Sequence, residues 1–347
     1  MSSTSMTAPT DLIWQSKKPA TANWQQQLKT LVREPAQLFA LLGLQAEDMP
    51  AHLAACQDFS LRVPTAFVDK MQPGDWNDPL LLQVLPQGAE LLAQPGFIAD
   101  PLQEQSNNPH PGLIHKYHGR VLLVVSGGCA INCRYCFRRH FPYEDNNPSR
   151  KEWQTALDYI AADSSISEVI LSGGDPLVAS DKQLAELIAN IAAIPHVQTL
   201  RVHSRLPLVI PERISDEFVT LLTSSRLQTV FVIHCNHANE LDSRVQQAMA
   251  KLKAAGVTLL NQSVLLAKVN DNSAALQALN EKLFAMGVLP YYLHVLDKVQ
   301  GAAHFDVDES HAIALIESLR TKLPGYLVPK LVRELPQQAS KTPIPAY

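Results

Sequence analysis

The sequence predicts an α/β protein, an open and partial parallel (β/α) barrel that follows a mainly helical N-terminal region. Short β-branched apolar runs recur at intervals of roughly 30 residues, which is the size of a βαβ unit. An amphipathic segment lies between each pair of runs, as right-handed crossovers between parallel strands require. The runs allow six to seven units, and because a closed barrel needs eight, we expect an open one.

The helical region is expected to end near residue 110. Residues 1–110 contain helix-like segments such as "PAQLFALLGL" and "VPTAFVDKM", with prolines as breaks. The polar connector Asp100–Gly112, "DPLQEQSNNPHPG", is rich in Pro and Asn and marks a boundary. Residues 111–347 are then expected to form the barrel and a C-terminal segment.

The barrel strands are expected at "RVLLVV", "EVILSGGD", "LRVHSR", "TVFVIH", "VTLLNQSVLL", "LPYYLHVL" and "YLVPKLV". Segments such as "SDKQLAELIANIAAI" and "DSRVQQAMAKLKAAG" supply the helices between them. The loops that follow the strands are polar. Because chemistry in such barrels sits at the carboxyl ends of the strands, these loops are expected to converge on one site.

Composition narrows the classes of partner. The 347 residues are 46% hydrophobic and 18% charged, with a net charge of -4, so no basic face for nucleic acid is expected. "MSSTSMTAPTDLIWQSKKP" lacks the apolar core of a signal peptide, and no apolar run approaches the roughly 20 residues of a membrane span. We therefore expect a cytoplasmic protein without a membrane partner.

Cysteine is concentrated in one loop, "GGCAINCRYCFRRHF". Cys129, Cys133 and Cys136 follow the first barrel strand with C-x3-C-x2-C spacing. Four thiolates saturate a [4Fe–4S] cluster, whereas three leave one iron open to another ligand. The alternatives are a zinc site that adds His140, or thiols that bind no metal.

This spacing after a first barrel strand resembles the radical S-adenosylmethionine (SAM) superfamily. The resemblance implies a [4Fe–4S] cluster whose open iron binds SAM, which is cleaved to a 5'-deoxyadenosyl radical. "SGGDPL" (Ser172–Leu177) ends the second strand, where the superfamily has a Gly-Gly-acid turn. Its glycines let the backbone approach a ligand, and the resemblance places the SAM ammonium at Asp175.

Longer segments resemble the lysine 2,3-aminomutase family, from about Gly112 to Lys341. They include "CRYCFRRHF", "HSRLPLVIPERI", "HCNHANEL", "LLNQSVLLAKVNDN", "YYLHVLDKVQGAAHF" and "GYLVPKLVREL". The nearest resemblance is to the bacterial branch that makes (R)-β-lysine for modification of elongation factor P. It implies an isomerase that acts on L-lysine, with an electron donor such as flavodoxin or ferredoxin.

That family also uses pyridoxal 5'-phosphate (PLP), which a lysine side chain holds covalently. The family's lysine lies near the C-terminus, before an x-Pro sequence, and "SKTP" places it at Lys341. Lys330 in "LVPKLV" is the competing candidate. It falls in a strand-like run and lacks the x-Pro sequel, so Lys341 is the catalytic lysine that the resemblance favours.

The resemblance assigns both ends of the substrate. Arg138 matches the family's carboxylate-binding Arg, and a guanidinium fork suits bidentate pairing. Asp297 and Glu334 match two acids that hold the distal ammonium, although the family usually has Asp where Glu334 stands. Two acids at this end argue against an acidic substrate.

Further cofactor contacts follow from the same resemblance. Tyr117 is expected to pack on the PLP ring, and Lys116 or Arg120 to neutralise its phosphate, although the family has Arg where Lys116 stands. His234 and Gln262 lie at strand ends and are expected near the adenosine of SAM. Polar groups at such positions are otherwise satisfied within a barrel core, and Ser204 and Arg205 share that alternative.

The sequence ends six residues after Lys341, without the C-terminal extension through which catabolic relatives assemble. We therefore expect a monomer or weak dimer without structural zinc. Two alternative functions stay open: an aminomutase for another amino acid, and a binding module whose cysteine loop is a zinc clip.

Overall fold

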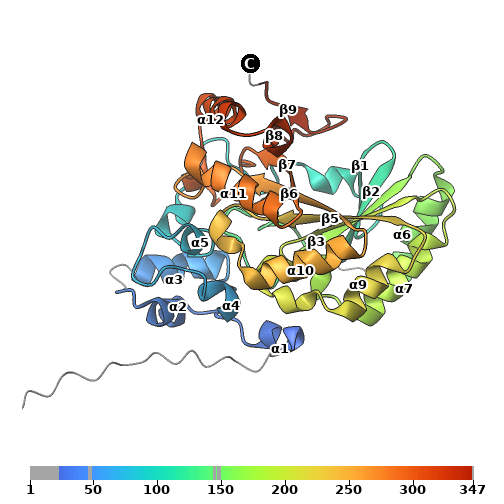
Figure 1. Ribbon diagram of the computed structural model, residues 1–347, viewed down its shortest axis with the longest axis horizontal. Helices are drawn as coiled ribbons and strands as arrows, with labels where there is room; N and C mark the ends of the chain where they lie inside the picture. The colour runs from blue at the N-terminus through green and yellow to red at the C-terminus, as the bar shows by residue number, and fades with distance from the viewer. Residues whose placement is uncertain (1–22, 46–48, 144–145, 147–149, 346–347) are drawn as a thin grey trace, which may run out of the picture.

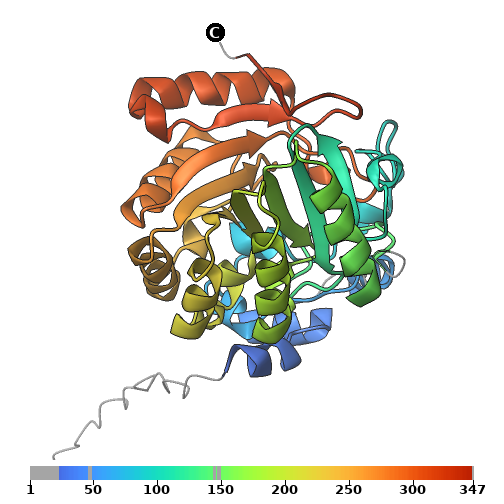
Figure 2. The same ribbon diagram turned by 90° about the vertical axis from the view of Figure 1, so that its right-hand side faces the viewer.

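The computed structural model describes residues 23–45, 49–143, 146 and 150–345. The N-terminal stretch that bears on a signal peptide lies outside them. The described chain forms one sheet of nine strands in sequential order, β1 to β9, with helices on its outer side (Figures 1 and 2).

The sheet is parallel from β2 to β8. These strands are β2 (Arg120–Ser126), β3 (Glu168–Gly173), β4 (Thr199–Ser204), β5 (Gln228–His234), β6 (Thr258–Val264), β7 (Leu289–His294) and β8 (Lys330–Arg333). Six crossovers join them, which confirms the expected six to seven units and the open barrel. Sequence reasoning missed the two antiparallel edge strands, β1 (Leu113–Tyr117) and β9 (Thr342–Pro343).

Seven α-helices lie in the crossovers between the parallel strands of the described chain. They are α6 (Arg150–Ala162), α7 (Asp181–Ala192), α8 (Leu206–Val209), α9 (Asp216–Thr223), α10 (Ser243–Ala254), α11 (Ser273–Ala285) and α12 (Glu309–Lys322). In α7, Ser180 caps the N-terminus by accepting from the Gln183 amide, while Leu184, Leu187 and Ile191 are buried. These three residues belong to the same buried apolar cluster as Val169 and Leu171 of β3.

The N-terminal region is helical, as expected. It contains α1 (Trp24–Lys29), α2 (Pro35–Leu42), α3 (Met49–Asp58), α4 (Thr65–Val68) and α5 (Pro79–Leu82). Figure 1 shows these helices beside the barrel. Val32, Leu38 and Phe67 belong to the same buried apolar cluster as the barrel residues Val169 and Phe231. The helical region therefore shares a core with the barrel.

None of the described helices combines the length and apolarity that crossing a lipid bilayer demands.

Candidate functional site

The cysteine loop follows β2 and rests against the turn that follows β3. Asp175 donates its backbone N–H to the Gly128 carbonyl at 2.9 Å. A side chain at Gly174 would place its Cβ 2.5 Å from that same oxygen, so only glycine allows the two loops to approach this closely. The "SGGDPL" glycines therefore pack one strand end against the next.

All three loop cysteines are free thiols with limited exposure. Burial, then the negative charges of Asp175 and of the other two cysteines, raises the pKa of Cys129 well above its usual range. Burial and Cys133 raise the pKa of Cys136 to about 11. The three thiols are therefore close enough for their charges to repel one another, and a bound cation would reduce this repulsion.

Three thiols in one loop suit an iron–sulfur cluster. Within the described ranges, no three His, Cys, Asp or Glu side chains are arranged to bind one metal ion. A [4Fe–4S] cluster bonds each thiolate to a different iron and so does not need that arrangement. The alternative zinc ligand, His140, places its Nε2 3.2 Å from the Gln300 carbonyl.

The side chain of Asp175 joins the loops that follow β3 and β4. Its carboxylate accepts from the backbone N–H groups of Leu177, Arg205 and Leu206 at 2.9–3.0 Å. The Ser204 hydroxyl donates to both of its oxygens, at 2.8 and 3.0 Å. These bonds make the buried carboxylate a structural link between the β3 and β4 loops, and the expected contact of Asp175 with the SAM ammonium stays a prediction.

Arg205 connects the cysteine loop to the barrel, a contact that sequence reasoning left open. Its Nη1 donates to Cys133 Sγ at 2.8 Å and to the Tyr135 hydroxyl at 2.6 Å. Its Nη2 donates to Glu240 Oε2 at 3.0 Å. Tyr135 in turn lies 3.0 Å from His234 Nε2. A buried cation thus contacts one of the three loop thiols.

His234 and Gln262 are paired neighbours at the ends of β5 and β6. Burial and the charge of Arg205 lower the pKa of His234 to about 3, so its imidazole is neutral. His203 Nε2, on β4, is buried without a hydrogen-bond partner in the described chain. Burial lowers the pKa of His203 well below its usual value, and the positive charges of Arg201, Lys341 and Arg138 lower it further. Such an orphaned polar atom fits a barrel interior that a ligand fills.

A second group of predicted residues meets where the two edges of the open sheet approach each other. Lys116 on β1 reaches Glu334, which follows β8, with 3.0 Å between Nζ and Oε1. Lys341, just before β9, places its Nζ 2.5 Å from Glu334 Oε2. These two cations lower the pKa of Glu334 far below its usual range, against the effect of burial. The exposed Lys330 at the start of β8 has no such neighbour in the described structure.

Asp297, Tyr117 and Arg120 lie beside this group. Burial, then the charge of Glu334, raises the pKa of Asp297 to about 7. Burial and the Glu334 carboxylate also raise the pKa of Tyr117 above its ordinary value. The Arg120 guanidinium stacks over the Tyr117 ring at 4.9 Å. An amine, two further cations and an aromatic ring fit a phosphorylated aldehyde cofactor such as PLP.

Arg138 is engaged by an acid that sequence reasoning missed. Glu104, in the connector, accepts from Arg138 Nε at 2.6 Å and from Nη2 at 2.8 Å. Lys116 Nζ lies 3.5 Å from the same carboxylate. Ion pairs therefore run without a break from Arg138 through Glu104, Lys116 and Glu334 to Lys341. The only sequence signal for Glu104 was an acid within a polar linker, which also contains Asp100.

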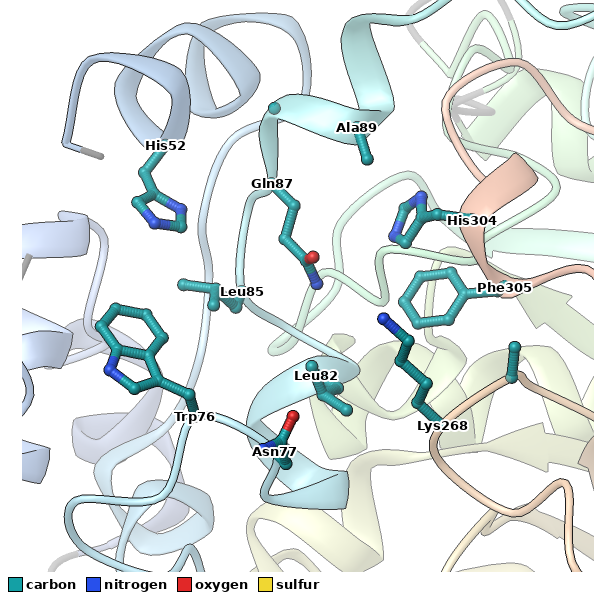
Figure 3. Close-up of a pocket in the computed structure, with 12 residues that line it drawn as sticks. His52, Trp76, Asn77, Leu82, Leu85, Gln87, Ala89, Lys268, His304 and Phe305 are labelled. Carbon is teal, nitrogen blue, oxygen red and sulfur yellow. The ribbon is translucent and has the colours of Figure 1, made fainter. Parts of the chain in front are cut away.

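A cavity of about 520 Å³ lies elsewhere, between the helical region and the barrel. Its lining includes Trp76, Gln87, Lys268 and His304 (Figure 3). It contains none of the predicted site residues. It is therefore separate from the candidate site, whose charged groups contact one another directly.

Comparison with known proteins decides the family. The sequence pattern of the radical SAM superfamily matches residues 123–276. The L-lysine 2,3-aminomutase of Haemophilus influenzae is 53% identical over 320 residues, which cover 92% of this chain and 95% of that protein. The Escherichia coli K12 enzyme of the same name is 53% identical over 327 residues, covering 94% and 95%. This chain belongs to the lysine 2,3-aminomutase family. The Clostridium subterminale relative is 35% identical over 324 residues and extends further, since only 77% of it is covered.

Membership in the lysine 2,3-aminomutase family confirms the predicted enzyme class, an isomerase with radical SAM chemistry. It excludes the alternative of a non-enzymatic zinc-binding module. The superfamily's [4Fe–4S] cluster and SAM agree with the thiol set after β2. A small-molecule substrate is likewise consistent with these relatives.

Proposed function

We propose that this chain converts L-α-lysine to (R)-β-lysine with PLP held on Lys341, a cluster on the three loop cysteines, and SAM. The named activity of its relatives supports the reaction and the substrate. The observation that carries the proposal is the unbroken series of ion pairs from Arg138 to Lys341. It joins the predicted carboxylate-binding residue, an ammonium-binding acid and the cofactor lysine in one place.

The chain offers separate groups of residues to each cofactor. When bound, the cluster with SAM supplies a carbon radical that removes hydrogen, and PLP supplies a π-system across which an amino group can migrate. The residues that would hold the cluster are Cys129, Cys133 and Cys136, with His234 and Gln262 toward SAM. Those that would hold PLP are Lys341, Lys116, Tyr117 and Arg120.

The chain's own task is to hold the substrate at both ends and to exclude water. Arg138 would bind the α-carboxylate and Asp297 with Glu334 the ε-ammonium. In the ligand-free chain Glu334 is neutralised by Lys116 and Lys341. Once the Lys341 amine is engaged elsewhere, Glu334 loses one cation and can accept the substrate ammonium in its place. Two acids at this end disfavour an aminomutase for acidic amino acids.

The biological setting is part of the same proposal. The resemblance to the branch that serves elongation factor P supports the (R) product and a role in that modification. A flavodoxin or ferredoxin would deliver the electron that starts the reaction. The protein would work in the cytoplasm as a monomer or weak dimer.

The test is anaerobic turnover of L-lysine with SAM, PLP and a reductant, with the product resolved by chiral chromatography. We expect (R)-β-lysine, and no product when SAM is left out. Glutamate and alanine offered in the same assay address the alternative substrate classes. If either replaces lysine as the better substrate, the proposed specificity is wrong.

A further inference from the structure

The Arg138 guanidinium can hold two carboxylates, and Glu104 occupies only one of its faces. A guanidinium has five N–H donors in a planar fork, so it pairs side-on through Nε and Nη2 and end-on through Nη1 and Nη2. Glu104 takes the side-on face at 2.6 and 2.8 Å. Nη1 reaches the Gly173 carbonyl at 3.2 Å and Ser172 Oγ only at 3.5 Å. Glu104 takes one of the two Nη2 N–H groups, so the other, together with the longer and weaker contacts of Nη1, remains for another acid at the end-on face.

We propose that Glu104 is a positioning residue, which holds the Arg138 guanidinium so that its end-on face binds the substrate's α-carboxylate. The proposal rests on the proposed function, because it takes the carboxylate of L-lysine as the ligand of Arg138.

Burial makes such a partner necessary in the ligand-free chain. Arg138 is 7% exposed and Glu104 4% exposed, and an unpaired buried guanidinium would be strongly destabilising. Burial alone would raise the pKa of Glu104, but the charge and hydrogen bonds of Arg138 lower it below its usual value. The carboxylate therefore stays ionised and keeps the fork in place when no substrate is bound.

The local charge still favours a second carboxylate. Lys116 Nζ lies 3.5 Å from Glu104 Oε1, and in the series of ion pairs from Arg138 to Lys341 three cations face two acids, Glu104 and Glu334. Glu104 therefore fixes the geometry of Arg138 without cancelling the positive charge around it. A substrate carboxylate at the end-on face would complete the neutralisation in a site with little exposure to solvent.

The backbone places Glu104 by a specific local structure. Gln103 adopts a left-handed conformation at φ 48°, which is rare for a residue with a side chain. The Glu104 N–H then donates to Asp100 Oδ1 at 3.2 Å. Slightly upstream, Ile98 exchanges 3.0 Å backbone bonds with Lys298 and Gln300, in the loop that carries Asp297. One connector thus links the predicted binding groups for both ends of the substrate.

The competing interpretation is that Glu104 merely occupies the substrate's place and must leave before lysine binds. The two interpretations predict opposite signs. A positioning residue makes lysine bind more tightly, whereas an occupant makes it bind more weakly. Replacement of Glu104 by the isosteric but neutral Gln separates them.

The experiment uses the full chain loaded with cluster and PLP, without SAM or reductant, in anaerobic titration calorimetry. The probes are L-lysine and 1,5-diaminopentane, which is lysine without its carboxylate. The variants are Glu104→Gln and Glu104→Asp, the latter keeping a charge on a shorter arm. The matched control is Glu168→Gln, because Glu168 accepts from Arg201 Nε at 3.0 Å at the start of β3, the end of the strand opposite the site.

For Glu104→Gln we expect L-lysine affinity to fall at least about tenfold, the worth of a charge-assisted hydrogen bond. Affinity for 1,5-diaminopentane should change less than about twofold, since this ligand lacks the carboxylate that Arg138 would bind. Glu104→Asp should recover part of the loss, and Glu168→Gln should show none. In turnover, the KM for lysine should rise more than kcat falls.

Three results would overturn the proposal. Unchanged or tighter lysine binding in Glu104→Gln identifies Glu104 as an occupant. Equal losses for both ligands show a general structural role. If the parent protein binds lysine no better than 1,5-diaminopentane, the assignment of Arg138 to a substrate carboxylate fails, and the proposed function must then be revised as well.

Discussion

Lys341 Nζ lies 2.5 Å from Glu334 Oε2, across the antiparallel pair that β8 forms with β9. The register places Arg333 opposite Thr342, so the next residues outward on each side are Glu334 and Lys341. Cross-strand neighbours of opposite charge attract each other. This short two-stranded element directs the amine of Lys341 toward the group formed by Glu334, Lys116 and Asp297.

Lys341→Ala should abolish covalent PLP binding, because Lys341 is the proposed cofactor lysine and Lys116, the other amine beside Glu334, is also paired with Glu104. The check is borohydride reduction of the PLP-loaded protein followed by peptide mass spectrometry. Lys330→Ala is the matched control, since Lys330 is an exposed lysine on the same hairpin, and it should keep the cofactor. A modified peptide that contains Lys330 in place of Lys341 would show that the assignment is wrong.

Cys133→Ala should reduce iron and sulfide from about four atoms each per chain to near zero, because two thiolates hold a [4Fe–4S] cluster poorly. Iron and sulfide analysis after anaerobic reconstitution measures this. Cys56→Ala is the control, as Cys56 is a free cysteine outside the three-cysteine motif, and its Sγ contacts the backbone of Arg33 and Leu61. Full cluster content in the Cys133 variant would contradict the ligand assignment.

Affinity for L-lysine should rise with pH until about pH 7 and then level off. The pKa of Asp297 is raised to about 7 by burial and by Glu334, so below that pH the acid is protonated and cannot pair with an ammonium. Below pH 7 the affinity for L-lysine is expected to fall by up to about tenfold per pH unit. Calorimetric titration with lysine between pH 5.5 and 8.5 gives the profile.

The Asp297→Asn variant should bind lysine weakly at every pH, without the rise in affinity toward pH 7.

The Asp297 carboxyl has the opposite effect on the stability of the ligand-free fold. Because folding raises its pKa, the folded state binds the proton more tightly, and stability from this group falls as pH rises from about 4 to about 7. A parent profile without a change near pH 7 would remove Asp297 from the ammonium site.

Glu90→Gln should destabilise the fold by about 3–5 kcal/mol, because it leaves a buried guanidinium without its charge partner. Glu90 accepts from Arg134 Nε and Arg139 Nη2, each at 2.9 Å, and the side chains of all three are 0% exposed. Urea unfolding monitored by tryptophan fluorescence measures the loss. Asp216→Asn, which breaks an exposed pair with Lys251, should leave the midpoint nearly unchanged.

The barrel was predictable because strand and helix periodicity are local properties of the chain. Apolar runs at βαβ spacing indicated β2 to β8, and each is present in sequence order. The edge strands β1 and β9 were missed because they are short and their polar residues interrupt the apolar pattern by which the other strands were recognised. The contacts of Asp175 could not be predicted, because the "GGD" pattern does not reveal that Ser204 and three backbone N–H groups donate to its carboxylate.

By itself the sequence determined the order of the strands, the polar loops at their carboxyl ends and the three-thiol loop, since each depends on residues close together in the chain. Only the tertiary structure decided which charges meet. Lys116 and Glu334 are 218 residues apart and touch because the curved sheet brings its two edges together. Glu104 reaches Arg138 because one left-handed residue turns the connector inward. Such contacts depend on sheet curvature and backbone direction, which residue types along a chain do not specify.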